Sequence, residues 1–149
     1  MERKILIQQN IKKDLINYGD KSPTKEVCGF LLGKKSSKIW ECNEFIPLTN
    51  ISDSQEVHYI PEPNEMFAAL SKTTHMDPQA NKDLVGVFHT HPHHYARPSI
   101  TDLTGAGYQG FYFIYSPKYD ELNAFYYDGG EPKFEDASYD TEMKEYYHA

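Results

Sequence analysis

The chain has 149 residues, of which 39% are hydrophobic and 25% are charged. This length suits one compact domain, residues 1–149, which can bury roughly 70% of the surface of its unfolded chain. The 15 Lys and Arg against 22 Asp and Glu give a formal net charge of -7, and no dense basic run occurs. The charge pattern therefore argues against a nucleic-acid partner.

The cysteine count indicates a reducing compartment, and the hydropathy pattern argues against a signal peptide and a membrane span. Two cysteines, Cys28 and Cys42, are too few for a disulfide framework, and Cys28 stands in an apolar run where a small buried hydrophobe is expected. The apolar run near the N-terminus is too short for a signal peptide, and no later segment is long enough to span a membrane. We expect a cytoplasmic protein that does not contact a membrane, while the oligomeric state is left open.

The N-terminal third predicts a strand, a helix and a hairpin. Residues 4–8 are a candidate strand, and the apolar residues that follow recur at helical spacing up to Gly19, where a glycine cap is expected. Two further apolar strands, 27–32 and 38–48, are separated by a polar turn and form a candidate hairpin. Glu26 stands at the start of this hairpin, where a carboxylate could equally be a plain exposed charge.

The middle of the chain predicts a crossover. A short strand at 57–60 precedes a helix with Asn64 as its N-cap, and the apolar strand that begins at Leu84 follows. Strand, helix and strand in this order indicate an α/β element in a mixed sheet. In the strand from Leu84, alternation puts Val85 and Val87 on one face and Leu84 and Phe88 on the other, so both faces are apolar and the strand is expected to be central.

The C-terminal third predicts strands and one frayed helix. Residues 111–115 and 121–127 are candidate strands, Asp128-Gly129 is a tight-turn signal, and residues 133–136 could pair back. The last segment, 141–149, could form a helix.

A group of potential metal ligands lies between these regions. His89 and His91 are two residues apart at the end of the apolar strand, so their side chains point to the same face. After a polar loop, Ser99 reads as a helix N-cap, and Asp102 in the first turn could reach back toward the strand end. Two histidines and one carboxylate would leave a fourth tetrahedral position for water, which is typical of catalytic zinc.

Simpler interpretations exist for each part of this group. A serine followed three residues later by an acid is also a helix-capping signature. With seven histidines in the chain, a pair two residues apart could be accidental. His93 and His94 lie in the intervening loop, where they could line a groove, or His93 could supply a fourth ligand, although a solvated loop is the simpler interpretation.

The pattern resembles the signature of the JAMM (MPN-plus) metallopeptidases. His89-Thr90-His91, seven residues, Ser99, two residues and Asp102 match the family's H-[ST]-H-x7-S-x-x-D, and Glu26 in KEVCGFLLG is similar to the family's upstream glutamate. The resemblance implies a JAMM-type, cytidine-deaminase-like α/β domain with a mixed central sheet flanked by helices. It also implies that His89, His91 and Asp102 bind one Zn²⁺ per chain, that Glu26 accepts a proton from the zinc-bound water, and that Ser99 stabilises the tetrahedral intermediate.

Two functions from different classes follow. The first is a zinc metallopeptidase or isopeptidase acting on a protein or peptide, for example the tail of a ubiquitin-like protein. The alternative is a JAMM-like binding or assembly scaffold, for example in a phage tail, whose zinc is idle or absent. Because all five motif residues are present, the enzyme is favoured. A nucleobase deaminase is set aside, since neither H-x-E nor P-C-x-x-C occurs.

Overall fold

A computed structural model describes residues 2–142, and its seven strands belong to one mixed sheet. The strands follow the order β1-β3-β2-β4-β5-β6-β7, and β7 pairs with β1, so the sheet closes into a barrel. In chain order the elements are β1 Arg3–Gln8, α1 Gln9–Asp20, β2 Cys28–Lys34, β3 Trp40–Leu48, α2 Pro63–Leu70, β4 Asp83–Thr90, α3 Ile100–Gly105, β5 Gly110–Ser116, β6 Glu121–Tyr127 and β7 Glu135–Glu142. The predicted mixed sheet with flanking helices is confirmed, whereas its closure was not anticipated.

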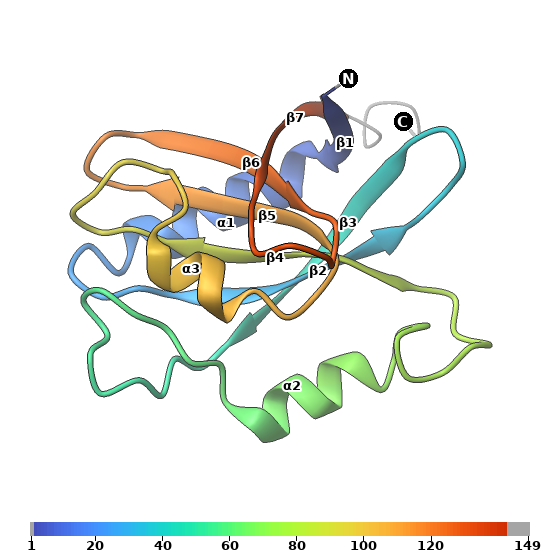
Figure 1. Cartoon of the computed structure of the whole chain (residues 1–149), viewed down its shortest axis with the longest axis horizontal. Coiled ribbons are helices and arrows are strands. Elements are labelled where there is room, and N and C mark those ends of the chain that lie inside the picture. The colour runs from blue at the N-terminus through green and yellow to red at the C-terminus, as the bar shows by residue number, and fades with distance from the viewer. Residues whose placement is uncertain (1, 143–149) are drawn as a thin grey trace.

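The helices lie on different sides of the sheet (Figure 1). In this view α1 lies behind the strands, α3 lies in front of them and α2 lies below. Strand β2 is antiparallel to both β3 and β4, so the chain crosses over β2 through α2. The predicted crossover through a helix is confirmed, but its first strand is β3 rather than residues 57–60. None of the described helices has both the length and the apolar character that a membrane span requires.

Strand β4 is central, with β2 on one side and β5 on the other, and both of its faces are buried. The predicted alternation is wrong at one place. Leu31 pairs with Gly86 but Leu32 pairs with Leu84, so Val85 is an extra residue in β4. This bulge puts Val85 in the same core cluster as Phe88, while Leu84 joins Val87 in the cluster on the other face.

Gly19 lies inside helix α1, so the prediction that it caps the helix is wrong. The helix continues through Gly19 to Asp20, and Lys21 is the C-cap residue. Gly19 is buried against the ring of Tyr115, where an added Cβ would lie 2.5 Å from Cδ2 of that ring. The glycine is therefore needed for close packing between α1 and β5.

Residues 57–60 do not form the predicted strand. An isolated bridge pairs Asn50 with Pro61, the residue directly after this segment. The Asn50 side chain replaces a ladder: its Oδ1 accepts from the backbone N–H of Ser52 and Ile60, and its Nδ2 donates to the carbonyls of Glu26 and His58. The half-buried amide of Asn50 thus shapes the loop next to Glu26.

The C-terminal strand is longer than predicted. Strand β7 pairs antiparallel with β6 and parallel with β1, after a connection that is longer than a tight turn. Residues 141 and 142 belong to β7, and the rest of the helix predicted over 141–149 lies outside the described residues.

Gly86 offers a test of the close approach between β4 and β5. A Cβ at this position would lie 2.1 Å from the carbonyl oxygen of Phe111, a backbone atom that cannot move aside. We expect Gly86→Ala to lower the free energy of unfolding by about 3 kcal/mol, because the two central strands must separate. Gly107→Ala is the control, since a Cβ there meets nothing within 4 Å. Equal urea midpoints for the two variants would contradict this packing.

Candidate metal centre

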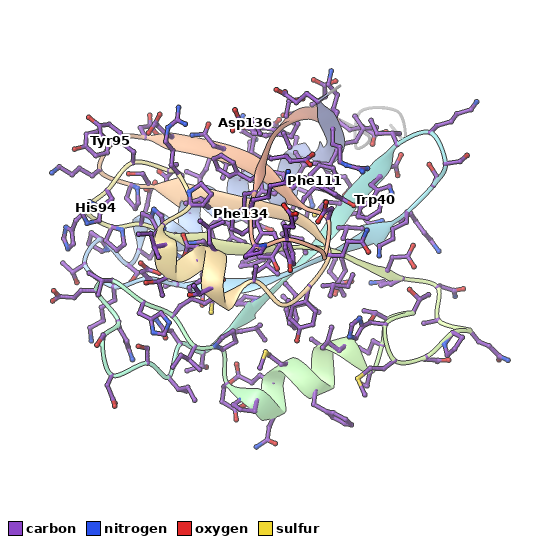
Figure 2. All side chains as sticks on the ribbon, in the orientation of Figure 1. Trp40, His94, Tyr95, Phe111, Phe134 and Asp136 are labelled. Carbon is purple, nitrogen blue, oxygen red and sulfur yellow. The ribbon has the colours of Figure 1, made fainter. Side chains whose placement is uncertain are left out.

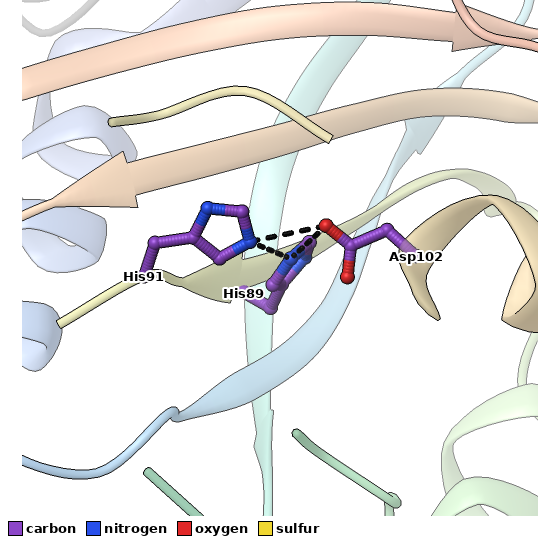
Figure 3. Close-up of side chains that lie close together, drawn as sticks. All are labelled: His89, His91 and Asp102. Carbon is purple, nitrogen blue, oxygen red and sulfur yellow. Dashed lines mark hydrogen bonds and ion pairs between the residues drawn. The ribbon is translucent and has the colours of Figure 1, made fainter. Parts of the chain in front are cut away.

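The side chains of His89, His91 and Asp102 converge on one point (Figure 3). Nε2 of His89 and Nε2 of His91 lie 3.1 Å apart, and they lie 3.1 Å and 3.0 Å from Oδ2 of Asp102. The two imidazoles come from the C-terminal end of β4, and the carboxylate comes from the first turn of α3. The structure therefore brings together all three residues that the sequence predicted as metal ligands.

Helix α3 begins with a capping box that also aims the carboxylate. The Ser99 hydroxyl accepts from the backbone N–H of Asp102 at 3.1 Å, and Oδ2 of Asp102 accepts from the backbone N–H of Ser99 at 2.9 Å. The predicted cap is therefore confirmed, and the same Oδ2 atom also lies among the candidate metal-ligand atoms. Accepting leaves the O–H of Ser99 available as a donor.

The electrostatics favour an ionised carboxylate next to a neutral His89. Burial opposes ionisation of Asp102, but His89, His91 and the Ser99 N–H outweigh it and hold the pKa of Asp102 well below its usual range. Burial lowers the pKa of His89. Burial would also lower the pKa of His91, but the hydrogen bonds to Asp102 and to the Tyr95 carbonyl raise it overall. A metal ion requires an ionised carboxylate and neutral imidazoles, and a bound cation would itself displace the proton from His91.

The orientation of His91 is set by a contact that the sequence did not reveal. Its Nδ1 lies 2.9 Å from the carbonyl oxygen of Tyr95, so Nε2 is directed to the centre. The next residue, Ala96, is fully buried, and its carbonyl accepts from Nδ2 of Asn123 on β6 at 3.1 Å. Asn123 therefore fixes the loop that holds His91. No local sequence signal marks this residue, since 27 positions separate it from Ala96.

His89 has a different environment. Its ring stacks on Tyr59, with ring centroids 4.6 Å apart and an interplanar angle of 26°. Its Nδ1 is buried and finds no hydrogen-bond partner within the described part of the chain. Packing against Tyr59 and the contact of Nε2 with Asp102 therefore orient this imidazole, with no hydrogen bond at Nδ1 among the described residues.

Glu26 lies at the same end of the barrel, just before β2. The backbone of Val27 is tied to Thr90 on β4 by two hydrogen bonds: the Val27 carbonyl accepts from the Thr90 N–H, and the Val27 N–H donates to the Thr90 hydroxyl oxygen. Glu26 is 5% exposed, and its Oε1 has no hydrogen-bond partner among the residues that the structure describes. Burial raises the pKa of this carboxyl to about 8, against the lowering effect of His91. The simple interpretation of an exposed strand-end charge is thereby wrong.

A cavity of about 440 Å³ brings Glu26, His91 and Ser99 together. The loop that precedes α3 contributes His94, Tyr95 and Arg97 to its wall. Figure 2 shows His94 and Tyr95 at one end of the molecule and Trp40 toward the other. His93 is exposed and does not belong to the group of converging ligands. All five predicted site residues thus lie at one site, while their chemical roles stay predictions.

The donor set fits a tetrahedral zinc ion. Around Zn²⁺ with Zn–N distances of 2.0–2.1 Å, tetrahedral ligand atoms are about 3.3 Å apart, close to the separations found here. One oxygen and two nitrogen donors match the ligands that zinc prefers, and one of the three residues, His91, also lines the cavity with Glu26.

Comparison with known families agrees with this geometry. Residues 9–128 match the Prok-JAB family, described as prokaryotic homologs of the JAB domain. This chain belongs to the Prok-JAB family. The JAMM resemblance drawn from the motif is therefore confirmed.

Individual relatives give the same picture. The chain is 32% identical over 96 residues to a desampylase of Haloferax volcanii, a match that covers 64% of this chain and 65% of that protein. A solution structure from Desulfitobacterium hafniense shares the fold, with a TM-score of 0.73 and 21% identity over 97% of this chain and 99% of that one. A second, from Salinibacter ruber, has a TM-score of 0.63 and 26% identity over 96% and 91%.

The contact from Asn123 can be tested through metal affinity. We expect Asn123→Ala to weaken binding of a divalent ion about 10-fold, because the loop that orients His91 loses its hydrogen bond to β6. Affinity is measured by competition with a chromogenic chelator. Asn43→Ala, at an exposed position on β3, is the matched control and should bind as the wild type does. Unchanged affinity in Asn123→Ala would show that the loop holds its place without this bond.

Proposed function

We propose that this protein is a zinc-dependent metallopeptidase or isopeptidase of the JAMM type. The observation that carries the proposal is the pairing of two features at one site. Three donor atoms converge within 3.0–3.1 Å, and a buried carboxylate oxygen without a partner among the described groups lines the adjoining cavity. The first feature suits a metal, and the second suits a proton acceptor.

A bound zinc ion would supply Lewis acidity and lower the pKa of a coordinated water to about 7. His89, His91 and Asp102 would hold the ion. Glu26 would take the proton of the attacking water, because burial keeps its carboxylate poorly solvated and raises its pKa to about 8. A nearby cation would lower that pKa toward neutrality, where a carboxylate can both accept a proton and pass it to the leaving amine.

Ser99 would act on the substrate carbonyl rather than on the attacking water. Its hydroxyl oxygen accepts from the Asp102 N–H, which leaves the O–H to donate to the oxyanion that develops on the substrate carbonyl. Ser99 and Glu26 line the same cavity, so both can reach one scissile bond.

The substrate class is proposed from the family. The similarity to a protein named desampylase supports an isopeptidase, and the resemblance to JAMM enzymes suggests the tail of a ubiquitin-like protein as substrate. Because the match covers only 65% of that relative, we extend its activity to this chain as a proposal alone.

The metal can be tested by elemental analysis of purified protein. We expect about one zinc per chain in the wild type and loss of it in His89→Ala and Asp102→Ala, because each removes a donor from a three-residue site. His93→Ala is the matched control, since this exposed histidine lies outside the group, and it should keep its zinc. A folded wild type that cannot be loaded with zinc would favour the scaffold alternative.

The role of Glu26 is tested separately. We expect Glu26→Gln to keep its zinc and to lose cleavage of a ubiquitin-like fusion about 100-fold or more, because an amide cannot accept the proton. Cleavage is followed by gel electrophoresis, with zinc content measured on the same samples. Full activity in Glu26→Gln would assign the proton transfer to another group.

A further inference from the structure

A second cavity, of about 260 Å³, lies beside the metal centre, with Asp102 but not Glu26 in its lining. Its floor is the buried sheet face formed by Phe30, Val87 and Tyr112, and its walls come from the loop before α2, from α2 itself and from α3 with the segment after it. The remaining lining residues are His58, Tyr59, Pro61, Met66, Thr101, Asp102, Gly105 and Tyr108. This apolar pocket is not needed for the proposed proton transfers.

Two residues join the apolar pocket to the metal centre. The ring of Tyr59 stacks on His89 at 4.6 Å and also forms part of the pocket wall. Asp102 contacts both imidazoles and lines the pocket as well. In addition, Thr101 lines both this pocket and the cavity that holds Glu26. A molecule bound at the centre can therefore extend one group into the apolar pocket.

The lining determines what kind of group fits. The core cluster on this face of the sheet contains Phe30, Val87 and Tyr112. The pocket is therefore a gap among apolar side chains that are otherwise closely packed. Most of the lining is apolar or aromatic, and it contains no lysine or arginine. A carboxylate in the pocket would lose its hydration without a lysine or arginine to pair with, whereas burial of an aliphatic group is favourable.

We infer that the apolar pocket selects a medium-sized, uncharged aliphatic side chain of the substrate next to the bond that is cut. The volume is smaller than the 300 Å³ or more of a typical pocket for a whole ligand, which is why one side chain is the expected occupant. This inference rests on the proposed function, and it names a feature of the substrate that the metal centre alone does not define.

The test uses zinc-loaded full-length protein and simple hydroxamates, which bind zinc and extend one chain from it. Acetohydroxamate carries a methyl group, hexanohydroxamate has four more methylenes, and adipic monohydroxamate replaces the terminal methyl of that chain with a carboxylate. We expect hexanohydroxamate to bind about 10-fold or more tightly than acetohydroxamate, since each buried methylene is favourable. The carboxylate should cancel that gain. Dissociation constants are measured by calorimetry.

Variants of the lining test whether the tighter binding of hexanohydroxamate arises in the apolar pocket. Gly105 lines it, and a Cβ at this position meets nothing within 4 Å, so Gly105→Leu can fill space without strain. Gly105→Leu should lose most of the gain and bind acetohydroxamate as the wild type does. Gly107→Leu is the matched control, because this glycine is equally open but lies outside the pocket lining. Met66→Gln, on the α2 wall, should also lower the gain by making the wall polar.

The outcomes separate the two proposals. Equal affinities of the wild type for acetohydroxamate and hexanohydroxamate, or an unchanged gain in both pocket variants, would overturn the apolar pocket and leave the enzyme proposal intact. A protein that takes up no zinc, or a zinc-loaded protein that binds no hydroxamate, would instead overturn the proposed function and the pocket with it.

Discussion

Oδ2 of Asp102 is the atom on which the site depends. It accepts from the Ser99 N–H and lies 3.0 Å and 3.1 Å from the imidazole nitrogens of His91 and His89. The start of α3 is thus tied to the end of β4 through one oxygen. A short helix of six residues has little stability of its own, so this contact and its cap define where the helix lies. The cavities on either side of α3 follow from that position.

Two buried carboxyl groups share this site but have opposite tendencies. Hydrogen bonds and imidazoles stabilise the charged form of Asp102 and lower its pKa, whereas burial without a partner for Oε1 raises the pKa of Glu26 to about 8. Environments that shift the pKa values of two neighbouring carboxyl groups in opposite directions are typical of sites in which the two groups have different roles. Under the proposed function, the division would be between holding a cation and exchanging a proton. The opposite pKa shifts arise from burial and hydrogen bonding rather than from residue type.

The barrel provides the rigid support. Strand β4 pairs with β2 on one side and with β5 on the other. Cys28, two residues after Glu26, pairs with His89, so Glu26 lies near the end of the strand that carries His89. The polar loop 49–61 is shaped by Asn50, which bonds to the Glu26 carbonyl and to the loop's own backbone. One asparagine therefore connects Glu26 to the loop whose Tyr59 stacks on His89. Both cavities and the centre are consequently coupled through this loop.

The sequence by itself determined which three residues converge as candidate metal ligands, and it determined most of the elements. The two-residue spacing of His89 and His91 and the capping signature from Ser99 to Asp102 act over a few residues, where backbone periodicity leaves little choice. The motif also led to Glu26, because the resemblance to a known family supplied the upstream carboxylate that local reasoning alone treated as exposed. Helix and strand patterns located β1 to β6 and all three helices for the same local reason.

Only the tertiary structure decided the rest, because it depends on contacts between distant residues. The bulge at Val85 comes from pairing with β2, Gly19 is required by the ring of Tyr115, and the segment 57–60 follows the side chain of Asn50 instead of a partner strand. The closure of the barrel by β7 and β1 joins the two ends of the described chain. The support of His91 from Asn123 and the apolar pocket beside Asp102 also arise where separate elements meet, and no spacing along one strand or helix encodes such meeting points.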